Sequence, residues 1–330
     1  MYDFVRRILF TLPPEMAHTI ALTGLACMAK CLPKVHIDAR KSHRVMGIAF
    51  PNRIGLAAGL DKNGDYIKAL ARIGFGFLEI GTVTPKPQMG NPKPRLFRLI
   101  ENDALINRMG FNNKGLDHLL QQVEKLRTRP IIGINVGKGY ETPIIAAATD
   151  YLYGFEQAYP FADYITINIS SPNTPDLRQM QTPELLLGLL RELKDKQAEL
   201  TERFARYVPL VIKIAPDLSV FELEEMADIF LETKIDGVIA TNTSIQRFDI
   251  TSELAKEKGG LSGRPLFEAS LDIVRLLSRR LGEQIPIIAC GGIFSREEGQ
   301  AKLEAGAQLL QVYTGLIYKG PQLIRQLGSL

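Results

Sequence analysis

Short apolar runs alternate with stretches of helical periodicity from about residue 50 onward. Most of the apolar runs are rich in β-branched residues and lack polar alternation, a pattern typical of parallel strands that are covered on both faces. Eight runs are therefore predicted to be strands, at residues 54–57, 77–80, 131–136, 164–168, 210–214, 237–240, 285–289 and 309–312.

The stretches between these runs carry the periodicity of amphipathic helices. Ser219 and Ser295 are predicted to cap two of the helices, because acidic residues follow each hydroxyl in the first turn. Helices are predicted at residues 116–126, 183–204, 220–232, 266–281 and 296–305.

Eight β/α units over ~250 residues predict an α/β protein with a (β/α)8 barrel, the TIM-barrel fold. The alternative is a doubly wound open sheet that binds a dinucleotide. The first β-to-α turn counts against the open sheet, because residues 55–60 lack the GxGxxG spacing and Lys62 follows soon after.

Two connections after predicted strands, residues 82–113 and 241–265, are far longer than usual. Both leave the carboxyl ends of strands, where barrel enzymes place their active sites. We predict that they form walls or lids of a site, with a small hairpin around residues 95–99.

The amino-terminal region contains two apolar stretches, residues 2–12 and 16–29, separated by Pro13, Pro14 and Glu15. Neither stretch reaches the ~20 apolar residues that span a bilayer, and the pattern lacks a signal-peptide cleavage site. Two short helices of this kind either lie in a membrane interface or pack on the domain as a cap. The predicted division is a helical extension at 1–40 and a barrel at 41–330.

Composition narrows the class of partner. The chain is 45% hydrophobic with a net charge of +4, and its dispersed basic residues predict no nucleic-acid partner. Cys27, Cys31 and Cys290 cannot form an even disulfide framework, which fits a reducing, cytosolic compartment. Cys27 and Cys31 are predicted to be small buried apolar side chains, and no metal site is predicted.

Hydroxyl and carboxamide side chains cluster after the fourth predicted strand, at Asn168, Ser170, Ser171, Asn173 and Thr174. Asn offers both a donor and an acceptor, which suits a planar ligand with amide edges, and a Ser can move a proton if its surroundings help. The same residues also suit an ordinary hydrogen-bonded turn.

The other predicted strands end in small or hydrogen-bonding residues as well, which places these residues at one rim of the barrel. They are Ala58, Gly59, Leu60, Asp61, Lys62, Gly81, Thr82, Asn135, Lys213, Thr241, Asn242, Thr243, Cys290, Gly291, Gly292, Tyr313, Thr314 and Gly315.

Glycines after the last two strands are the usual barrel site for a phosphate, because backbone N–H groups can approach it closely. Gly263 could bring a further N–H group. Since the chain lacks a Walker motif, we expect a phosphate-bearing cofactor such as FMN. Lys213 lies in an apolar strand, where it either stabilises negative charge on a reduced flavin or snorkels from the barrel end.

Six longer motifs occur in the chain, at residues 57–64, 79–85, 106–112, 168–174, 213–217 and 259–265. Together they resemble dihydroorotate dehydrogenase, and the resemblance runs from the amino terminus to the last helix. It is to the class 2, membrane-associated, quinone-reducing form. Two features select this form: Ser171 stands where the soluble class carries Cys, and the chain has the amino-terminal helical extension that forms the quinone entrance in class 2.

The resemblance implies oxidation of (S)-dihydroorotate to orotate with FMN, in pyrimidine synthesis. Ser171 would remove the C5 proton with a relay from a water or a hydroxyl such as Thr174, and hydride would pass from C6 to the flavin. Electrons would then reach a membrane quinone, with the protein peripheral on the cytoplasmic face of the cell membrane.

The residues that the resemblance assigns fall into three groups. Substrate would contact Lys62, Asn107, Arg108, Met109, Gly110, Phe111, Asn168, Asn173, Asn242 and Thr243. FMN would contact Ala58, Gly59, Leu60, Asp61, Lys62, Thr82, Asn135, Asn168, Lys213, Thr241, Gly263, Gly292, Tyr313 and Thr314. A quinone tunnel would contain His18, Arg98 and Tyr313, with an apolar wall of Leu9, Phe10 and Leu12.

His18 also fits a packing role on an apolar helix. Two other functions compete with the resemblance. One is another FMN-dependent barrel oxidoreductase acting on a dihydropyrimidine, which would carry Cys at position 171 and lack the extension. The other is a non-catalytic peripheral membrane binding protein on a barrel scaffold.

Overall fold

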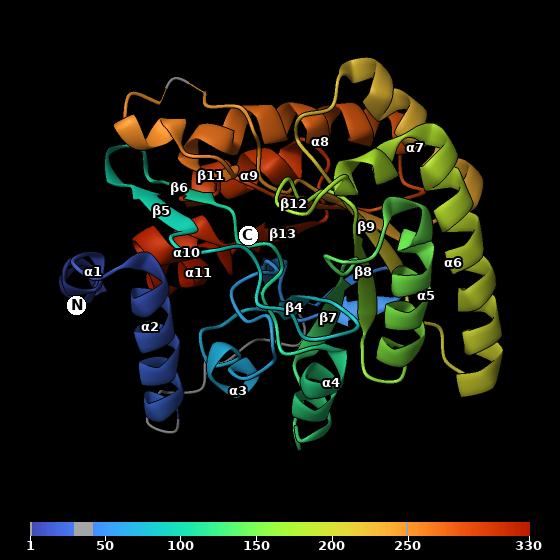
Figure 1. Ribbon diagram of the computed structural model, residues 1–330, viewed down its shortest axis with the longest axis horizontal. Helices are drawn as coiled ribbons and strands as arrows, with labels where there is room; N and C mark the ends of the chain where they lie inside the picture. Colours follow the sequence, from blue (N-terminus) through green and yellow to red (C-terminus); the bar gives the residue numbers. More distant parts are fainter. Residues whose placement is uncertain (1, 30–41, 249) are drawn as a thin grey trace.

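Eight parallel strands close into a barrel at the centre of the protein (Figure 1). The structure is a computed structural model that describes residues 2–29, 42–248 and 250–330. The barrel confirms the predicted (β/α)8 fold over the open sheet. Going round it, the strands are β3 (Ile54–Leu56), β4 (Phe77–Val83), β7 (Ile131–Val136), β8 (Tyr164–Asn168), β9 (Leu210–Ile214), β10 (Gly237–Ala240), β12 (Ile287–Cys290) and β13 (Leu309–Val312).

Helices surround the barrel, and the predicted ones begin and end close to the expected residues. Both expected caps are present. Ser219 and Glu222 form a reciprocal capping box, and the Ser295 hydroxyl accepts the Glu298 N–H. The helices after β3 are α3 (Ile67–Leu70), α4 (Leu116–Glu124), α5 (Ala147–Ala158), α6 (Pro183–Phe204), α7 (Val220–Thr233), α8 (Phe267–Leu281), α9 (Arg296–Glu304), α10 (Thr314–Lys319) and α11 (Pro321–Leu327).

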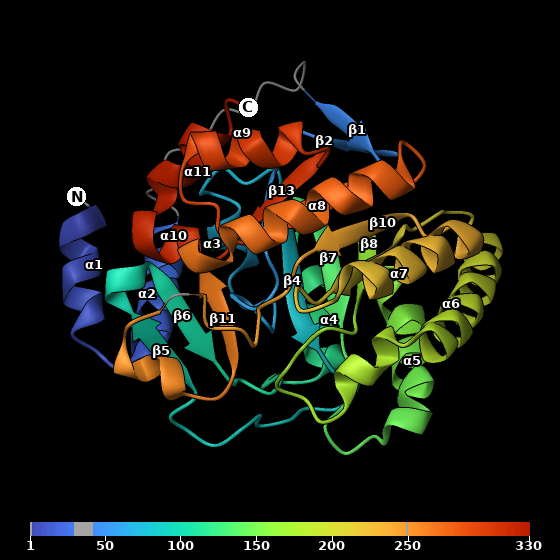
Figure 2. The ribbon, with the colours of Figure 1, turned by 90° about the horizontal axis from the view of Figure 1, so that it is seen from above.

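The amino-terminal end of the barrel is apolar and closed. A hairpin of β1 (His43–Val45) and β2 (Ile48–Phe50) covers it, on the side away from β11 (Figure 2). Phe50 packs there with Phe77 and Leu309. Farther along the same strands, the interior becomes polar. The rim at the carboxyl ends is therefore where ligand chemistry can occur.

The two long connections pair with each other above this rim. The first contains the predicted hairpin, β5 (Leu96–Leu99) and β6 (Ala104–Asn107), and the second contributes β11 (Gly260–Gly263). β11 runs antiparallel to β6, with Gly260 opposite Asn107, in a three-stranded sheet. We call this sheet the roof. The sequence did not predict β11 as a strand.

The amino-terminal helices α1 (Tyr2–Phe10) and α2 (Pro14–Met28) lie beside the roof and α10 (Figure 1). The Tyr2 hydroxyl donates to the Ile317 carbonyl at 2.7 Å, and Arg6 donates to the Tyr318 carbonyl at 2.5 Å. Arg95 forms a 2.7 Å ion pair with Glu15. These contacts dock the helices on the barrel as a cap.

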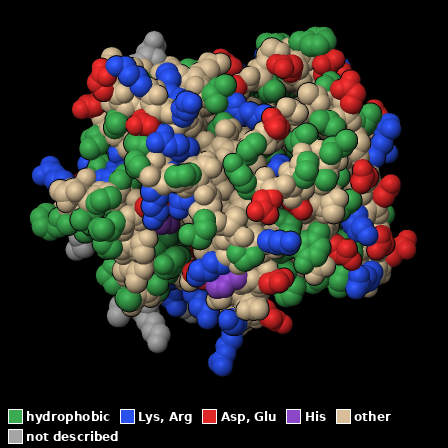
Figure 3. All heavy atoms as spheres, viewed as in Figure 1, with side chains coloured by type: hydrophobic (Ala, Val, Ile, Leu, Met, Phe, Trp, Pro, Cys, Tyr) green, Lys and Arg blue, Asp and Glu red, His purple; other side chains and the backbone are tan. Residues whose placement is uncertain are grey.

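The same two helices keep an apolar face exposed, at the left edge of Figure 3. Its side chains are Phe4, Val5, Ile8, Met16, Ile20 and Met28. Cys27 is exposed too, so the prediction that it is buried was wrong, because its side of α2 does not face the barrel. Cys31 and the predicted 40/41 boundary lie outside the described residues.

Within residues 2–29, 42–248 and 250–330, no helix combines the length and apolar character needed to cross a membrane. The same residues contain no group of three or more His, Cys, Asp or Glu side chains arranged to hold a metal ion.

A glycine in the barrel interior tests the packing. A Cβ at Gly133 would come within 2.1 Å of the Tyr164 ring. We expect Gly133→Ala to lower the free energy of unfolding by about 1–3 kcal/mol, because overpacking would displace the ring. Gly188 is the matched control, since it lies on the exposed face of α6 with nothing within 4 Å. Gly188→Ala should raise stability by up to about 1 kcal/mol in the same urea titration. Equal stability of the two variants would contradict the packing argument.

Candidate active site

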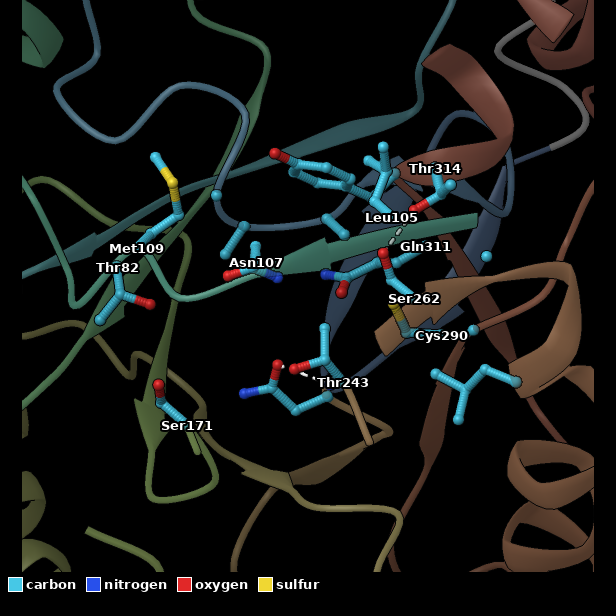
Figure 4. Close-up of a pocket in the computed structure, with 18 of the residues that line it drawn as sticks. Thr82, Leu105, Asn107, Met109, Ser171, Thr243, Ser262, Cys290, Gln311 and Thr314 are labelled. Carbon is cyan, nitrogen blue, oxygen red and sulfur yellow. Dashed lines mark hydrogen bonds between the residues drawn. The ribbon is translucent and has the colours of Figure 1, made fainter. Parts of the chain in front are cut away.

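A cavity opens between the carboxyl-terminal rim of the barrel and the roof (Figure 4). Most residues that the sequence nominated line it. They are His18, Ala58, Gly59, Lys62, Thr82, Asn107, Met109, Gly110, Phe111, Asn168, Ser171, Asn173, Lys213, Thr241, Asn242, Thr243, Gly263, Gly292, Tyr313 and Thr314. Thus the amino-terminal extension, the roof and the barrel rim share one cavity.

Three residues nominated for FMN do not line the cavity, because their side chains hold neighbouring loops or the core, and Leu9, Phe10 and Leu12 of the predicted quinone wall do not line it either. The Asp61 carboxylate accepts the backbone N–H groups of Asp65 and Tyr66, at 3.1 and 2.7 Å. Burial raises the pKa of Asp61, and these hydrogen bonds oppose the shift. Leu60 packs in the main apolar core. Asn135 is buried one layer below the cavity.

Two nominated arginines also point elsewhere. Arg108 pairs with Glu257 at 2.6 Å, and its guanidinium lies 4.6 Å from the centre of the Phe97 ring, so it ties the two roof connections together. Arg98 donates to the carbonyl of Phe10 at 2.7 Å and also to that of Leu12. It therefore clamps the chain between α1 and α2 against the hairpin.

The carboxamide cluster converges as expected. Ser171 follows β8, and its oxygen accepts the Asn173 N–H at 3.2 Å. The Asn173 side chain donates to the Asn107 carboxamide oxygen of β6 at 3.2 Å. In Figure 4, Ser171, Asn107 and Thr82 face the same space. Amide donors and acceptors thus surround a serine that is almost fully buried, in a site able to orient a planar ligand.

The far end of the cavity is built from glycines and hydroxyls. Gly292 has φ +73°, and a Cβ there would lie 2.4 Å from the Phe267 Cα, so only glycine fits. The hydroxyls of Ser262 and Thr314 are 2.8 Å apart on facing elements. Small residues and hydroxyls of this kind leave room for a phosphate.

Charged groups gather where α2 meets the cavity. Burial, followed by the charge of Arg95, lowers the pKa of Lys62 to about 8. Burial, followed by the Lys62 ammonium, lowers the pKa of His18 to about 4. Although burial opposes it, hydrogen bonds and charges from Arg95 and Lys93 hold the pKa of Glu15 below its usual value. An anionic ligand near Lys62 would relieve the crowding of positive charge.

Several lining residues were not nominated from the sequence as site residues, among them Glu15, Asn112, Ser262 and Gln311. The oxygens Asn112 Oδ1 and Gln311 Oε1 are buried and have no hydrogen-bond partner within the described part of the chain. Gln311 could have been nominated from the sequence, because it is a polar residue inside an apolar strand, as Lys213 is. The other residues reach the cavity only because particular loops pack together, and the pattern of apolar and polar positions does not predict that packing.

Comparisons with known proteins agree on one family. The family model "Dihydroorotate dehydrogenase" matches residues 41–329. The chain is 52% identical over 327 residues to the dihydroorotate dehydrogenase (quinone) of Azoarcus sp. (strain BH72), covering 99% of this chain and 97% of that protein. It is 50% identical over 330 residues to the protein of that name from Acinetobacter baylyi, covering 100% and 99%.

Solved structures give the same result. The crystal structure of DHODH from Eimeria tenella in complex with ferulenol superposes with a TM-score of 0.89 at 38% identity, covering 98% of this chain and 93% of that one. The ligand-free form from the same organism has a TM-score of 0.88 at 40% identity, covering 96% and 93%.

The lowered pKa of His18 gives a titration test. We expect the His18 imidazole to stay neutral down to a pH of about 4, because burial and Lys62 oppose its protonation. The unfolded chain takes up this proton at its ordinary pKa of 6.5, so stability should fall as pH drops from 6.5 towards 4. NMR of ¹³C-histidine protein would measure the midpoint, with His18→Gln identifying the resonance. A midpoint near 6.5 would contradict the described environment.

Proposed function

The chain belongs to the dihydroorotate dehydrogenase family in its quinone-dependent form, and from this we propose how its own residues carry out the reaction. It is an oxidoreductase of pyrimidine biosynthesis that oxidises dihydroorotate to orotate with a flavin and passes electrons to a quinone. The observation that carries the assignment to this cavity is the convergence of Asn107 of the roof with Ser171 and Asn173 of the barrel rim.

We propose that the flavin is FMN. The residues fit it, because the cavity offers a glycine and hydroxyl cradle at one end and unpaired buried acceptors, such as Gln311 Oε1, in its wall. Bound FMN would accept hydride from C6 of the substrate. Lys213 would stabilise negative charge on the reduced ring, and Gly263, Gly292 and Thr314 would hold the phosphate.

In the proposed substrate site, the carboxamides of Asn107, Asn173 and Asn242 bind the amide edges of the pyrimidine. Lys62 would pair with the substrate carboxylate, an anion that its crowded ammonium favours. Ser171 would remove the C5 proton. Its relay partner would be Thr174, whose hydroxyl is buried without a partner among the described residues.

We propose that the quinone enters between α1, α2 and the roof, where His18 and Tyr313 line the cavity and Arg98 holds the connecting chain. The exposed face with Phe4 and Ile8 would lie in the cytoplasmic surface of the cell membrane. Residues 1–40 would then act as an access unit for a barrel at 41–330, and the family match at 41–329 supports this division.

Ser171→Ala tests the proton-transfer assignment. The variant should bind FMN normally but reduce it about 10²–10⁴-fold more slowly than the wild type on anaerobic mixing with dihydroorotate, because the base is missing. Dihydroorotate should bleach the flavin absorbance of the wild type, and a quinone, but not fumarate, should then restore it. Ser329→Ala, an exposed serine distant in sequence, is the matched control. If dihydroorotate reduced the flavin of Ser171→Ala at the wild-type rate, Ser171 would not be the base. If the purified wild type contained no flavin, the FMN proposal would be wrong.

Membrane binding can be tested separately from chemistry. Phe4 and Ile8 are 70% and 52% exposed on α1, so Phe4→Ser/Ile8→Ser should abolish cosedimentation with vesicles of phosphatidylcholine and phosphatidylglycerol. Flavin reduction by dihydroorotate should stay unchanged. The control is Phe221→Ser, because Phe221 is 68% exposed on α7, outside the extension. If both variants lost cosedimentation with vesicles equally, binding would depend on exposed apolar side chains in general, and the proposed role of the α1 face would be wrong.

A further inference from the structure

Glu79 is a fully buried carboxylate in the barrel interior, one layer below the cavity. It accepts hydrogen bonds from Asn135 and Gln311, each at 2.7 Å, through different oxygens. Tyr164 and Thr166 donate to the same oxygen as Gln311, at 3.1 and 3.3 Å. A buried carboxylate with four donors is a well-satisfied acceptor, and its ionised form cannot donate.

A continuous chain of hydrogen bonds leads from Glu79 to the ligand-facing residues. Asn135 donates to Glu79, and its oxygen accepts the Thr82 hydroxyl at 2.5 Å. The Thr82 oxygen accepts the Asn168 amide at 2.9 Å. The Asn168 oxygen then accepts the backbone N–H of Ser170 at 3.2 Å. Thr82 and Asn168 both line the cavity, whereas Asn135 and Glu79 do not.

The chain is fixed in direction at both ends. Glu79 can only accept at one end, and the Ser170 backbone N–H can only donate at the other. The amides of Asn135 and Asn168 and the hydroxyl of Thr82 could each bind either way round, but only one direction satisfies both ends. A reversed chain would place two acceptors against each other at Glu79 and two donors against each other at Ser170, which is costly in a buried site.

We infer that Glu79 is a positioning residue that fixes the donor and acceptor directions of Thr82 and Asn168 toward the bound flavin and substrate. Glu79 also holds the Gln311 amide so that its unpaired oxygen lines the cavity. Gln311 would then be a further cofactor contact that receives a donor from the flavin. The inference rests on the proposed function, since it concerns the same cavity.

Glu79→Gln keeps the shape of the side chain but adds a donor. Its oxygen would keep the three donors Tyr164, Thr166 and Gln311, which turns its amino group toward Asn135. Asn135, Thr82 and Asn168 would then have to reverse in turn, until the Asn168 amino group met the Ser170 N–H. One donor–donor clash must remain somewhere in the chain.

The double variant Glu79→Gln/Asn135→Asp removes that clash. The glutamine amino group would donate to the new carboxylate, which would accept the Thr82 hydroxyl as Asn135 does. The net charge of the pair is unchanged, and every bond beyond position 135 keeps its direction. Recovery in this variant is a result that a purely space-filling role for Glu79 would not give.

We expect Glu79→Gln to weaken FMN binding to the apoprotein by about tenfold or more, and to shift the reduction potential of the bound flavin. The double variant should return FMN affinity to within about threefold of the wild type. Fluorescence titration with FMN and a spectroelectrochemical titration would measure these effects, together with KM and kcat for dihydroorotate. Asp228→Asn, in an exposed pair with Arg280, is the control and should change none of them.

Two outcomes would overturn the inference. One is wild-type FMN affinity and potential in Glu79→Gln. The other is a double variant as defective as Glu79→Gln, including failure of both to fold. Either result leaves the proposed function intact as long as the wild type is bleached by dihydroorotate, whereas an unbleached wild type would count against the function itself.

Discussion

Placing polar groups inside a barrel is the constraint on which the rest of this structure depends. The lower interior is closed by Phe50, Phe77 and Leu309, and Glu79 above them is fully buried, so its charge has to be stabilised by protein donors. Glu79 meets that constraint by collecting four donors from three strands, β7, β8 and β13. The polar floor of the cavity is therefore ordered by the protein itself, and a ligand meets side chains that are already oriented.

The upper half of the site depends on loops that stabilise each other. β11 completes the roof by pairing with β6, and the Arg108–Glu257 ion pair joins the same two connections. Arg95 and Arg98 extend from the hairpin region to α2 and to the chain between α1 and α2. The roof thus links the barrel rim to the amino-terminal helices. The same roof contacts therefore hold both the loops above the rim and the helices beside the cavity in place.

Periodicity made much of the fold predictable, because the strands are continuous apolar runs and the helices carry clear stripes. β11 escaped prediction because residues 260–263 have no β-branched side chain and form a strand only through β6, about 150 residues away. The cavity lining was foreseen largely through the resemblance and the shared rim. Directions of long side chains were not foreseen. Arg98 and Arg108 turn to carbonyls and a carboxylate whose positions depend on tertiary packing.

The docking of α1 has a consequence for how the protein is made. Its hydrogen bonds from Tyr2 and Arg6 reach residues 315 and 312 positions farther along the chain. On the ribosome, α1 emerges long before α10 exists, so Tyr2 and Arg6 have no docking partners until residues 317 and 318 have been synthesised. A nascent chain can therefore meet a lipid surface or a chaperone through α1 first, and this helix, although made early, docks late.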